Sequence, residues 1–239
     1  MSERYFVDEP LSPGRVMLGG PEAHHLIHVM RAAAGRRIVL FDGSGAEFPA
    51  VVQQVGRSEV ELSVAAREEV NRELPAEVTL GVALPKGDRQ KWLVEKAVEL
   101  GVTRIVPLRT ERGVAQPVEQ ALLRLRRAVI EASKQCGRNR LLQIGEPRDW
   151  PDFLEEAAGV PCRIVAHPLE KGDRHASPFP AEGLLDAAFL AIGPEGGLTA
   201  QEVALAVAAG WQTVDLGPRI LRVETAAVLL VAMLVQQFA

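Results

Sequence analysis

Two glycine-bearing segments near the end of the chain carry the residue types best suited to bind a small ligand. The first reads IGPEGGL over 192–198, and the second reads LGPRILRVETA over 216–226. Glycine lets a ligand approach the main chain closely, so that bare N–H and C=O groups become its binding partners. Each segment follows an apolar run and precedes a helical pattern. We expect the two turns to lie side by side at one edge of a sheet and to form a ligand site.

The spacing of these glycines differs from that of the common phosphate-binding motifs. Neither segment fits G-x-G-x-x-G, and G-x-x-x-x-G-K-[ST] occurs nowhere in the chain. An earlier pair, Gly43 and Gly45, lacks its third glycine because position 48 is phenylalanine. The sequence therefore argues against a dinucleotide or P-loop site, and it disfavours a nicotinamide-dependent oxidoreductase.

The elements that must position these turns follow the order of an α/β domain. Strands are predicted at 78–83, 104–108, 163–166, 187–192 and 212–216. Helices are predicted to begin at Asp88, at Pro117, at Thr199 and near Glu224. The helix at Thr199 carries a capping box, because Glu202 stands three positions later. This alternation predicts a parallel sheet covered on both faces, with ligands at the carboxyl ends of its strands, over residues 76–239.

The first part of the chain has a different pattern. Short β-rich runs at 37–41, 50–55 and 60–64 are separated by turn residues, and one helix is predicted at 21–31. A small antiparallel β-barrel over residues 1–70 is the simplest arrangement of these elements. The charged stretch after residue 66 contains a proline and is a plausible linker.

The composition narrows the setting in which the protein works. The formal charge of −4 over 239 residues gives no overall basic field, so a nucleic acid must be met by a local patch. The two cysteines, Cys136 and Cys162, lack CxxC spacing, which argues against a disulfide framework or a zinc site and fits a reducing compartment. No signal-type run begins the chain, and the apolar stretch 226–235 is too short to span a bilayer. We expect a cytoplasmic protein with neither a membrane partner nor a metal ion.

Local basic clusters are the candidate nucleic-acid contacts. Between Arg124 and Arg140 the chain holds six basic residues and one carboxylate, Glu131. Glu131, Gln135 and Arg138 are expected to fall on one helix face, at i, i+4 and i+7. Such a stripe facing phosphates would bind with strong salt dependence. The alternative is that the stretch is only a solvated helix face.

With further matches along the chain, the two C-terminal segments resemble the RsmE family, SPOUT-class enzymes that methylate N3 of a uridine in 16S ribosomal RNA. The further matches are LPKGD at 84–88, KAVELG at 96–101 and the pattern Glu131-Ala132-x-x-Gln135-x-x-Arg138. The N-terminal part fits the PUA-like RNA-binding domain of that family. The resemblance covers essentially the whole length of the chain.

The resemblance implies a deep trefoil knot in the C-terminal domain, which is an exception to the rule that chains do not thread. It also implies a homodimer that uses the last helix, and 16S rRNA or the small ribosomal subunit as partner. It assigns S-adenosylmethionine to residues in three loops: His167, Pro168, Leu169, Ile192, Gly193, Pro194, Gly196, Gly197, Leu216, Gly217, Ile220, Leu221, Arg222, Thr225 and Ala226. We expect RNA contacts from Arg4, His25, Arg31, Lys86, Lys134, Gln135 and Arg138.

Methylation of uridine N3 requires that its proton leave and that the resulting anion be stabilised. A cation near the uracil carbonyls would stabilise that anion. Arg222 is the first candidate for this cation, and Arg138 is the second. Glu195 or Glu224 is the expected proton acceptor, directly or through water. The alternative for Arg222 is an ion pair with Glu224 or with a carboxylate of the partner subunit, and the alternative for both glutamates is to hold loops.

Two other functions remain compatible with the sequence. An enzyme of the same fold would act on a ribose 2′-hydroxyl or on another base position. A ribosome-assembly factor would bind RNA without catalysing methyl transfer, and it would show no binding of S-adenosylmethionine.

Overall fold

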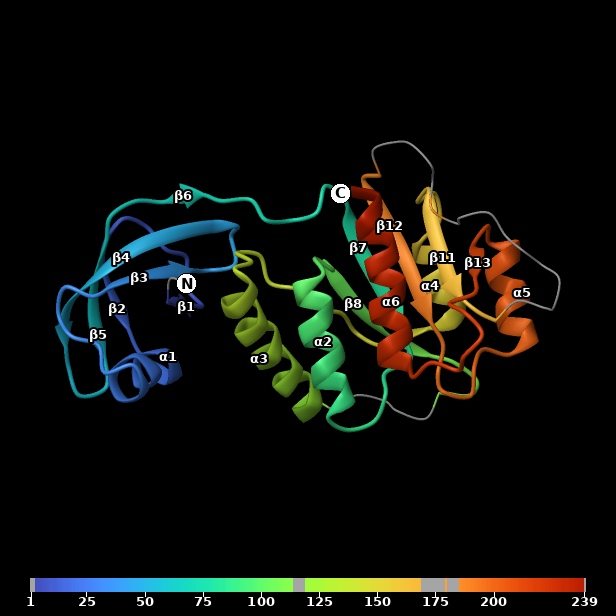
Figure 1. Ribbon diagram of the computed structural model, residues 1–239, viewed down its shortest axis with the longest axis horizontal. Helices are drawn as coiled ribbons and strands as arrows, with labels where there is room; N and C mark the ends of the chain where they lie inside the picture. Colours follow the sequence, from blue (N-terminus) through green and yellow to red (C-terminus); the bar gives the residue numbers. More distant parts are fainter. Residues whose placement is uncertain (1–2, 114–118, 169–178, 180–184, 239) are drawn as a thin grey trace. The chain divides into compact units, whose positions relative to one another are not determined.

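The computed structural model describes residues 3–113, 119–168, 179 and 185–238, which fall into two compact units (Figure 1). Unit 1 comprises Met1–Glu73 and Ser133–Leu141, and unit 2 comprises Leu74–Ala132 and Leu142–Ala239. The expected domains were 1–70 and 76–239. The structure differs in grouping Ser133–Leu141 with unit 1, although these residues lie far along the chain.

Unit 1 is built on a six-stranded sheet. Its main path runs β1 (Arg4–Phe6), β3 (Arg37–Phe41), β4 (Ala46–Val55), β5 (Val60–Val64) and β2 (Gly14–Leu18), while β6 (Glu68–Glu69) pairs with β4. The pairs are antiparallel except for β1 with β3. The predicted helix is a short α1 (Gly20–His24) continued by the π-helical turn η1 (His25–Val29). The core of this unit contains Tyr5, Leu26, Leu40, Phe48 and Leu62.

The segment Ser133–Leu141 joins unit 1 through polar side chains. Helix α3 (Glu119–Cys136) ends before Gly137, whose φ of +88° suits a residue without a side chain. Arg138 then donates from Nε to Glu73 at 3.1 Å, and the Asn139 amide donates to the Val70 carbonyl at 3.0 Å. The expectation that Arg138 shares a helix face with Gln135 is therefore wrong, because the helix has already ended.

Unit 2 contains the predicted parallel sheet, which is confirmed. Its order is β10 (Arg148–Asp149), β8 (Arg104–Arg109), β7 (Glu77–Val82), β12 (Ala187–Ile192), β11 (Cys162–Ala166) and β13 (Gln212–Val214), with β9 (Gln143–Ile144) also paired to β8. All of these pairs are parallel. The strands are mostly continuous apolar runs, as expected for a sheet that is buried on both faces.

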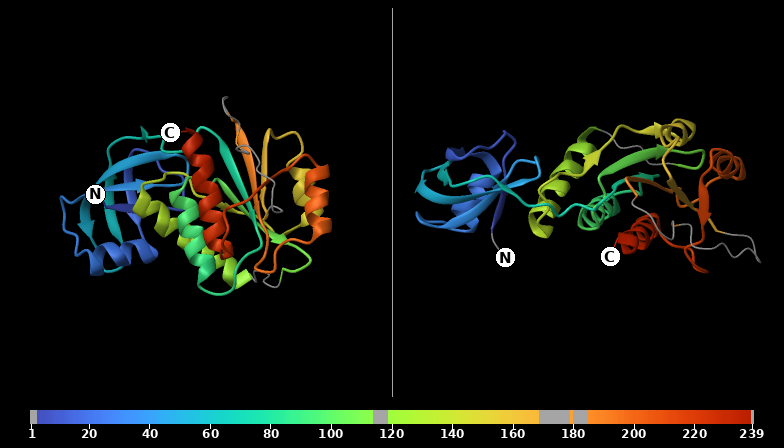
Figure 2. Two further views of the ribbon diagram at one scale, coloured as in Figure 1. Left: turned by 45° about the vertical axis from the view of Figure 1, so that its right-hand side comes forward. Right: turned by 90° about the horizontal axis from the view of Figure 1, so that it is seen from above.

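Helices cover both faces of this sheet (Figure 2). α2 (Arg89–Glu99) packs against α6 (Val223–Val235) on one face, and α6 also contacts β7 and β12. α4 (Trp150–Glu156) contacts β8 and α5 (Ala200–Ala208) contacts β13 on the other face. A short 3-10 turn, η2 (Gln236–Phe238), follows α6. The core under α4 and α5 is rich in aromatic rings, including Trp150, Phe153, Phe189 and Trp211.

The register of the sheet brings the ends of four strands to one level. Val82 lies opposite Ile192, Ile192 lies opposite Ala166, and Ala166 lies opposite Val214. Because these strands are parallel, all four residues stand at the carboxyl edge. The loops that follow β11, β12 and β13 therefore start side by side.

No helix in the described part of the chain combines the length and the hydropathy needed to cross a bilayer. Within the same residues, no three histidine, cysteine or acidic side chains are grouped so as to hold a metal ion.

Candidate active site

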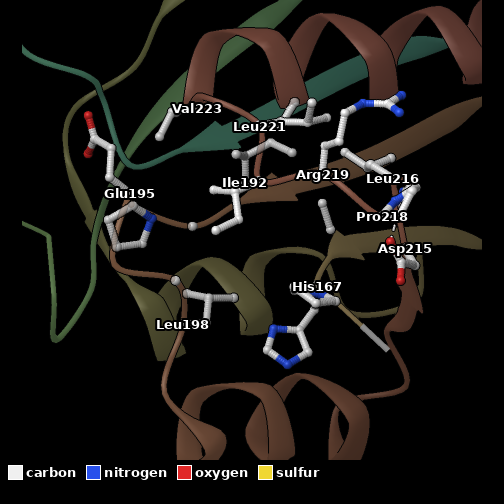
Figure 3. A pocket seen from close by; sticks show the side chains of 18 residues that line it. His167, Ile192, Glu195, Leu198, Asp215, Leu216, Pro218, Arg219, Leu221 and Val223 are labelled. Carbon is white, nitrogen blue, oxygen red and sulfur yellow. Dashed lines mark hydrogen bonds between the residues drawn. The ribbon is translucent and has the colours of Figure 1, made fainter. Parts of the chain in front are cut away.

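A cavity of about 380 Å³ lies in unit 2 at the carboxyl edge of the sheet (Figure 3). Its walls come from the loops after β11, β12 and β13 and from the start of α6. Figure 3 shows apolar side chains, among them Ile192, Leu198 and Leu221, around the space, with His167 on one side of it. The cavity therefore forms where the register aligns the strand ends.

Most residues assigned to a cofactor from the sequence line this cavity. They are His167, Pro168, Ile192, Gly193, Pro194, Gly197, Leu216, Gly217, Ile220, Leu221 and Ala226, joined by Glu195. Gly196, Arg222 and Thr225 do not belong to the lining, and Leu169 lies outside the described residues. The three loops named from the sequence thus meet at one cavity.

Six lining residues were not identified from the sequence: Ala166, Leu198, Asp215, Pro218, Arg219 and Val223. All six stand beside or inside the three loops named from the sequence. Ala166 ends the strand predicted at 163–166, directly before His167, and the register places it opposite Ile192.

Glycines shape the cavity in two different ways. At Gly193 a Cβ atom would lie 2.8 Å from Cγ of Leu198, so a side chain there would displace part of the wall. Gly197 and Gly217 have φ angles of +71° and +109°, which other residues adopt at a cost. Each closes a tight turn, because the Gly197 N–H donates to the Pro194 carbonyl and the Gly217 N–H donates to Oδ1 of Asp215, both at 2.8 Å.

Gly196 faces away from the cavity. Its carbonyl accepts a hydrogen bond from Nη1 of Arg112 at 2.9 Å, and a Cβ there would meet the Arg112 side chain at 3.5 Å, an ordinary contact. Arg112 therefore supports this loop from its outer side. The expectation that Gly196 itself touches a ligand is not supported by this placement.

His167 is a titratable group in the cavity wall. Burial lowers the pKa of this imidazole, while the carboxylate of Asp215 acts in the opposite direction. The lowered pKa favours the neutral imidazole at neutral pH. A neutral wall suits a positively charged ligand.

Charged groups stand at the edge of the cavity. Nη2 of Arg89 lies 3.3 Å from Oε1 of Glu195, and Nη1 lies 3.8 Å from Oε2 of Glu224. Arg222 is the N-cap residue of α6 and is exposed. Among the described residues it pairs with neither Glu224 nor another carboxylate.

Arg138 belongs to unit 1, is only 4% exposed and pairs with Glu73. Two other expected RNA contacts in unit 1 are also engaged: the Arg4 guanidinium pairs with Glu47, and the Lys134 ammonium pairs with Glu22 at 2.9 Å. His25 is half-buried. The expected RNA contacts with exposed side chains are Arg31, Lys86 and Gln135.

Family models identify the class of protein that this fold and site define. A model described as an RNA methyltransferase domain matches residues 72–235, and one described as an RNA methyltransferase PUA domain matches residues 18–65. The curated relatives are named ribosomal RNA small subunit methyltransferase E. The protein from Synechocystis is 34% identical over 91% of this chain and 72% of its own length, and that from Bacillus subtilis is 32% identical over 87% and 84%. The chain belongs to the ribosomal RNA small subunit methyltransferase E family.

Solved structures agree with this assignment over nearly the full length. A member of this family from Neisseria gonorrhoeae, bound to S-adenosyl methionine, is 31% identical with a TM-score of 0.83 over 97% of this chain and 96% of its own. A protein from Legionella pneumophila with bound cofactor SAM is 31% identical with a TM-score of 0.88 over 98% and 97%.

Proposed function

We propose that this protein transfers a methyl group from S-adenosylmethionine to N3 of a uridine in 16S ribosomal RNA of the small subunit. The observation that carries the proposal is the cavity of about 380 Å³ formed by three strand-end loops, in a chain of this family. Its volume lies within the range of small-molecule sites.

The residues present suit S-adenosylmethionine. Ile192, Leu198 and Leu221 supply apolar walls, and the turns at Gly197 and Gly217 bring the main chain itself to the cavity wall, where it would face the adenine and ribose edges. When bound, the cofactor supplies an electrophilic methyl group. The protein's main task is then to align the acceptor nitrogen and to exclude water.

The acceptor nitrogen must lose its proton before it can attack. Both glutamates pair with Arg89, but the Glu195 side chain lines the cavity and is 52% exposed, so it can reach a nucleobase, whereas the Glu224 side chain is buried. We therefore prefer Glu195 as the proton acceptor. Arg222, exposed and next to the lining residue Val223, is our candidate for the cation that stabilises the uracil anion. We give Arg138 no chemical role, because Glu73 already neutralises its charge.

We also propose the finer fold features that the resemblance implied, namely the knot in residues 76–239 and the barrel in residues 1–70. After β13, at one end of the sheet path, the chain returns as α6 to cover β7 and β12, near its middle. Such a return supports a threaded path. The loop after β11, through which the chain would pass, lies mostly outside the described residues.

The two units would divide the work. Unit 1, with its PUA match, would bind RNA through exposed side chains such as Arg31 and Arg37. In unit 2, three exposed arginines of α3 would be separate RNA contacts: Arg124, Arg126 and Arg127. Unit 2 would form a homodimer through α6, where Leu229 is 37% exposed, next to α2, where Trp92 is 42% exposed. The enzyme would act in the cytoplasm, where it meets small-subunit RNA.

The test is to incubate the protein with methyl-labelled S-adenosylmethionine and either 16S rRNA or small subunits lacking the modification. Mass spectrometry of the digested RNA should then find N3-methyluridine. A labelled ribose or another base would indicate a different enzyme of the same fold. RNA binding without label, together with a flat calorimetric titration of S-adenosylmethionine, would indicate an assembly factor.

A further inference from the structure

Arg89 stands where one guanidinium meets two carboxylates at the edge of the cavity. It is the first residue of α2, and its two terminal nitrogens lie 3.3 Å from Glu195 and 3.8 Å from Glu224. Glu195 belongs to the loop after β12, and Glu224 lies in the first turn of α6. One side chain therefore joins, through its charge, two elements that form the cavity wall.

Glu224 depends on this cation. It is only 6% exposed, and its Oε2 atom has no hydrogen-bond partner among the described residues. At 3.8 Å the contact with Arg89 is an ion pair and not a hydrogen bond. In the described part of the chain no other cation pairs with Glu224. A buried carboxylate that loses its counter-ion is strongly destabilising.

The residues beside both glutamates touch the ligand space. Val223 and Ala226 line the cavity on either side of Glu224, and Arg222 precedes them. Pro194 and Gly197 line it on either side of Glu195. A shift of Glu195 or Glu224 would therefore move the wall itself.

We propose that Arg89 is a positioning residue of the methyl-transfer site, which holds the β12–α5 loop and the start of α6 at fixed places by pairing with Glu195 and Glu224 together. This inference rests on the proposed function. An arginine suits the role because its forked donors can face two carboxylates, whereas a lysine presents a single point charge.

The test compares Arg89→Ala, Arg89→Lys and the double variant Arg89→Ala/Glu224→Gln with a control on the same helix. The control is Lys91→Ala, whose side chain is 66% exposed and pairs only with Glu95 one turn away among the described residues. Three quantities are measured on the full-length protein: the melting temperature, the Kd for S-adenosylhomocysteine by calorimetry, and the single-turnover rate of methyl transfer to small subunits.

We expect Arg89→Ala to lower the melting temperature. It should also weaken the binding of S-adenosylhomocysteine about tenfold and slow methyl transfer on the order of 100-fold, because small displacements of aligned groups reduce the rate strongly. Arg89→Lys should retain part of each, and Lys91→Ala should match the wild type. Removing the buried charge in Arg89→Ala/Glu224→Gln should restore the melting temperature but not the rate, since Glu195 still lacks its partner.

Two results would overturn the proposal. One is a wild-type Kd and rate in Arg89→Ala. The other is full recovery of the rate in the double variant, which would make Arg89 only a counter-ion for folding. If the wild-type protein itself binds no S-adenosylhomocysteine, the proposed function fails, and that result is distinct from a failure confined to Arg89.

Discussion

Gly193 shows how a missing side chain fixes the shape of the cavity. We expect Gly193→Ala to weaken S-adenosylmethionine binding by roughly fivefold to 150-fold, because its Cβ would stand 2.8 Å from Leu198 and displace that part of the cavity wall. Overpacking of this kind costs about 1–3 kcal/mol. Calorimetric titration measures the change. The matched control is Gly196→Ala, whose Cβ would make an ordinary contact at 3.5 Å with Arg112, and equal affinities for the two variants would contradict the assignment.

His167 gives the site a dependence on pH. Burial holds the pKa of this residue below its ordinary value of 6.5, so the folded protein takes up the proton less readily than the unfolded chain. The free energy of unfolding is therefore not reduced by His167 at a pH above 6.5. It decreases as the pH falls from 6.5 toward the lower pKa of His167 in the folded protein. A protonated imidazole would also repel the sulfonium. We expect calorimetry to show weaker cofactor binding at acid pH, and a flat profile for His167→Gln.

Asp215→Asn provides the companion test for His167. The Asp215 carboxylate opposes the effect of burial, so its removal should lower the pKa of His167 further and move the acid loss of affinity to lower pH. The asparagine amide oxygen can still accept the hydrogen bond from the Gly217 N–H. If the loss of cofactor affinity occurs at the same pH in Asp215→Asn as in the wild type, a group other than His167 causes that loss.

At the level of single residues, the sequence predicted which loops form the cavity better than it predicted which residues of those loops line it. The motif containing Gly196 and Gly197 could not show which glycine lines the cavity, because the outer side of this loop contacts Arg112, which follows a different strand, β8. Arg138 was misplaced for a local reason. Gly137 ends α3, so helical spacing no longer applies to the next residue.

Among the elements, α5 is held by an N-terminal capping box that the sequence predicted. Thr199 Oγ1 accepts from the Glu202 N–H at 3.3 Å, and the Glu202 carboxylate accepts from the Thr199 N–H at 2.8 Å. The other oxygen of Glu202 accepts from the Glu111 N–H at 2.8 Å. Glu202 therefore fixes both the start of α5 and the segment after β8.

We expect Glu202→Ala to lower the free energy of unfolding by about 2–4 kcal/mol, the sum of a lost cap and a lost charged hydrogen bond. Thr199→Ala should cost only about 1 kcal/mol, because it removes the cap alone. Urea denaturation of both variants measures the difference. Similar losses would show that the bond to Glu111 contributes nothing.

Several short elements were not predicted from the sequence, and for three of those in unit 2 the reason is physical. β9 and β10 are two residues each and carry no alternation to detect. α4 spans seven residues, and the packing of Trp150 and Phe153 under it holds it in place. The long strands and helices of unit 2 were predictable because their apolar runs and caps are local signals.

At the scale of the whole molecule, α6 is the expected site of dimerisation. It is almost entirely apolar, and Leu229 remains 37% exposed on it. We expect Leu229→Glu to convert a dimer to a monomer in analytical ultracentrifugation, because a carboxylate at such an interface would lose its water. Leu205→Glu on α5, where the wild-type leucine is 44% exposed, is the control and should stay dimeric. A wild-type monomer would refute the proposal directly.

RNA capture is the second property of the whole molecule. We expect Arg31→Glu/Arg37→Glu to weaken binding of 16S rRNA and to reduce its salt dependence, since two phosphate contacts are replaced by repulsion. S-adenosylmethionine affinity should stay unchanged, because the cavity is lined from unit 2 alone. Filter binding over a series of salt concentrations measures the effect. Unchanged RNA affinity would mean that these exposed arginines do not contact the RNA.

The sequence predicts only in part which residues belong to each of the two units. The change of pattern near residue 70 indicates the boundary, but no local signal shows that Ser133–Leu141 belongs with the first unit. That grouping rests on contacts distant in sequence, such as the one between Asn139 and Val70.

The central claim is that the loops after β11, β12 and β13 bind the methyl donor. A crystal structure with S-adenosylhomocysteine tests it most directly. We predict the ligand in the cavity between His167, Gly193 and Gly217, with Leu198 against it. A ligand bound elsewhere, with these loops closed on one another by packed side chains, would contradict the account.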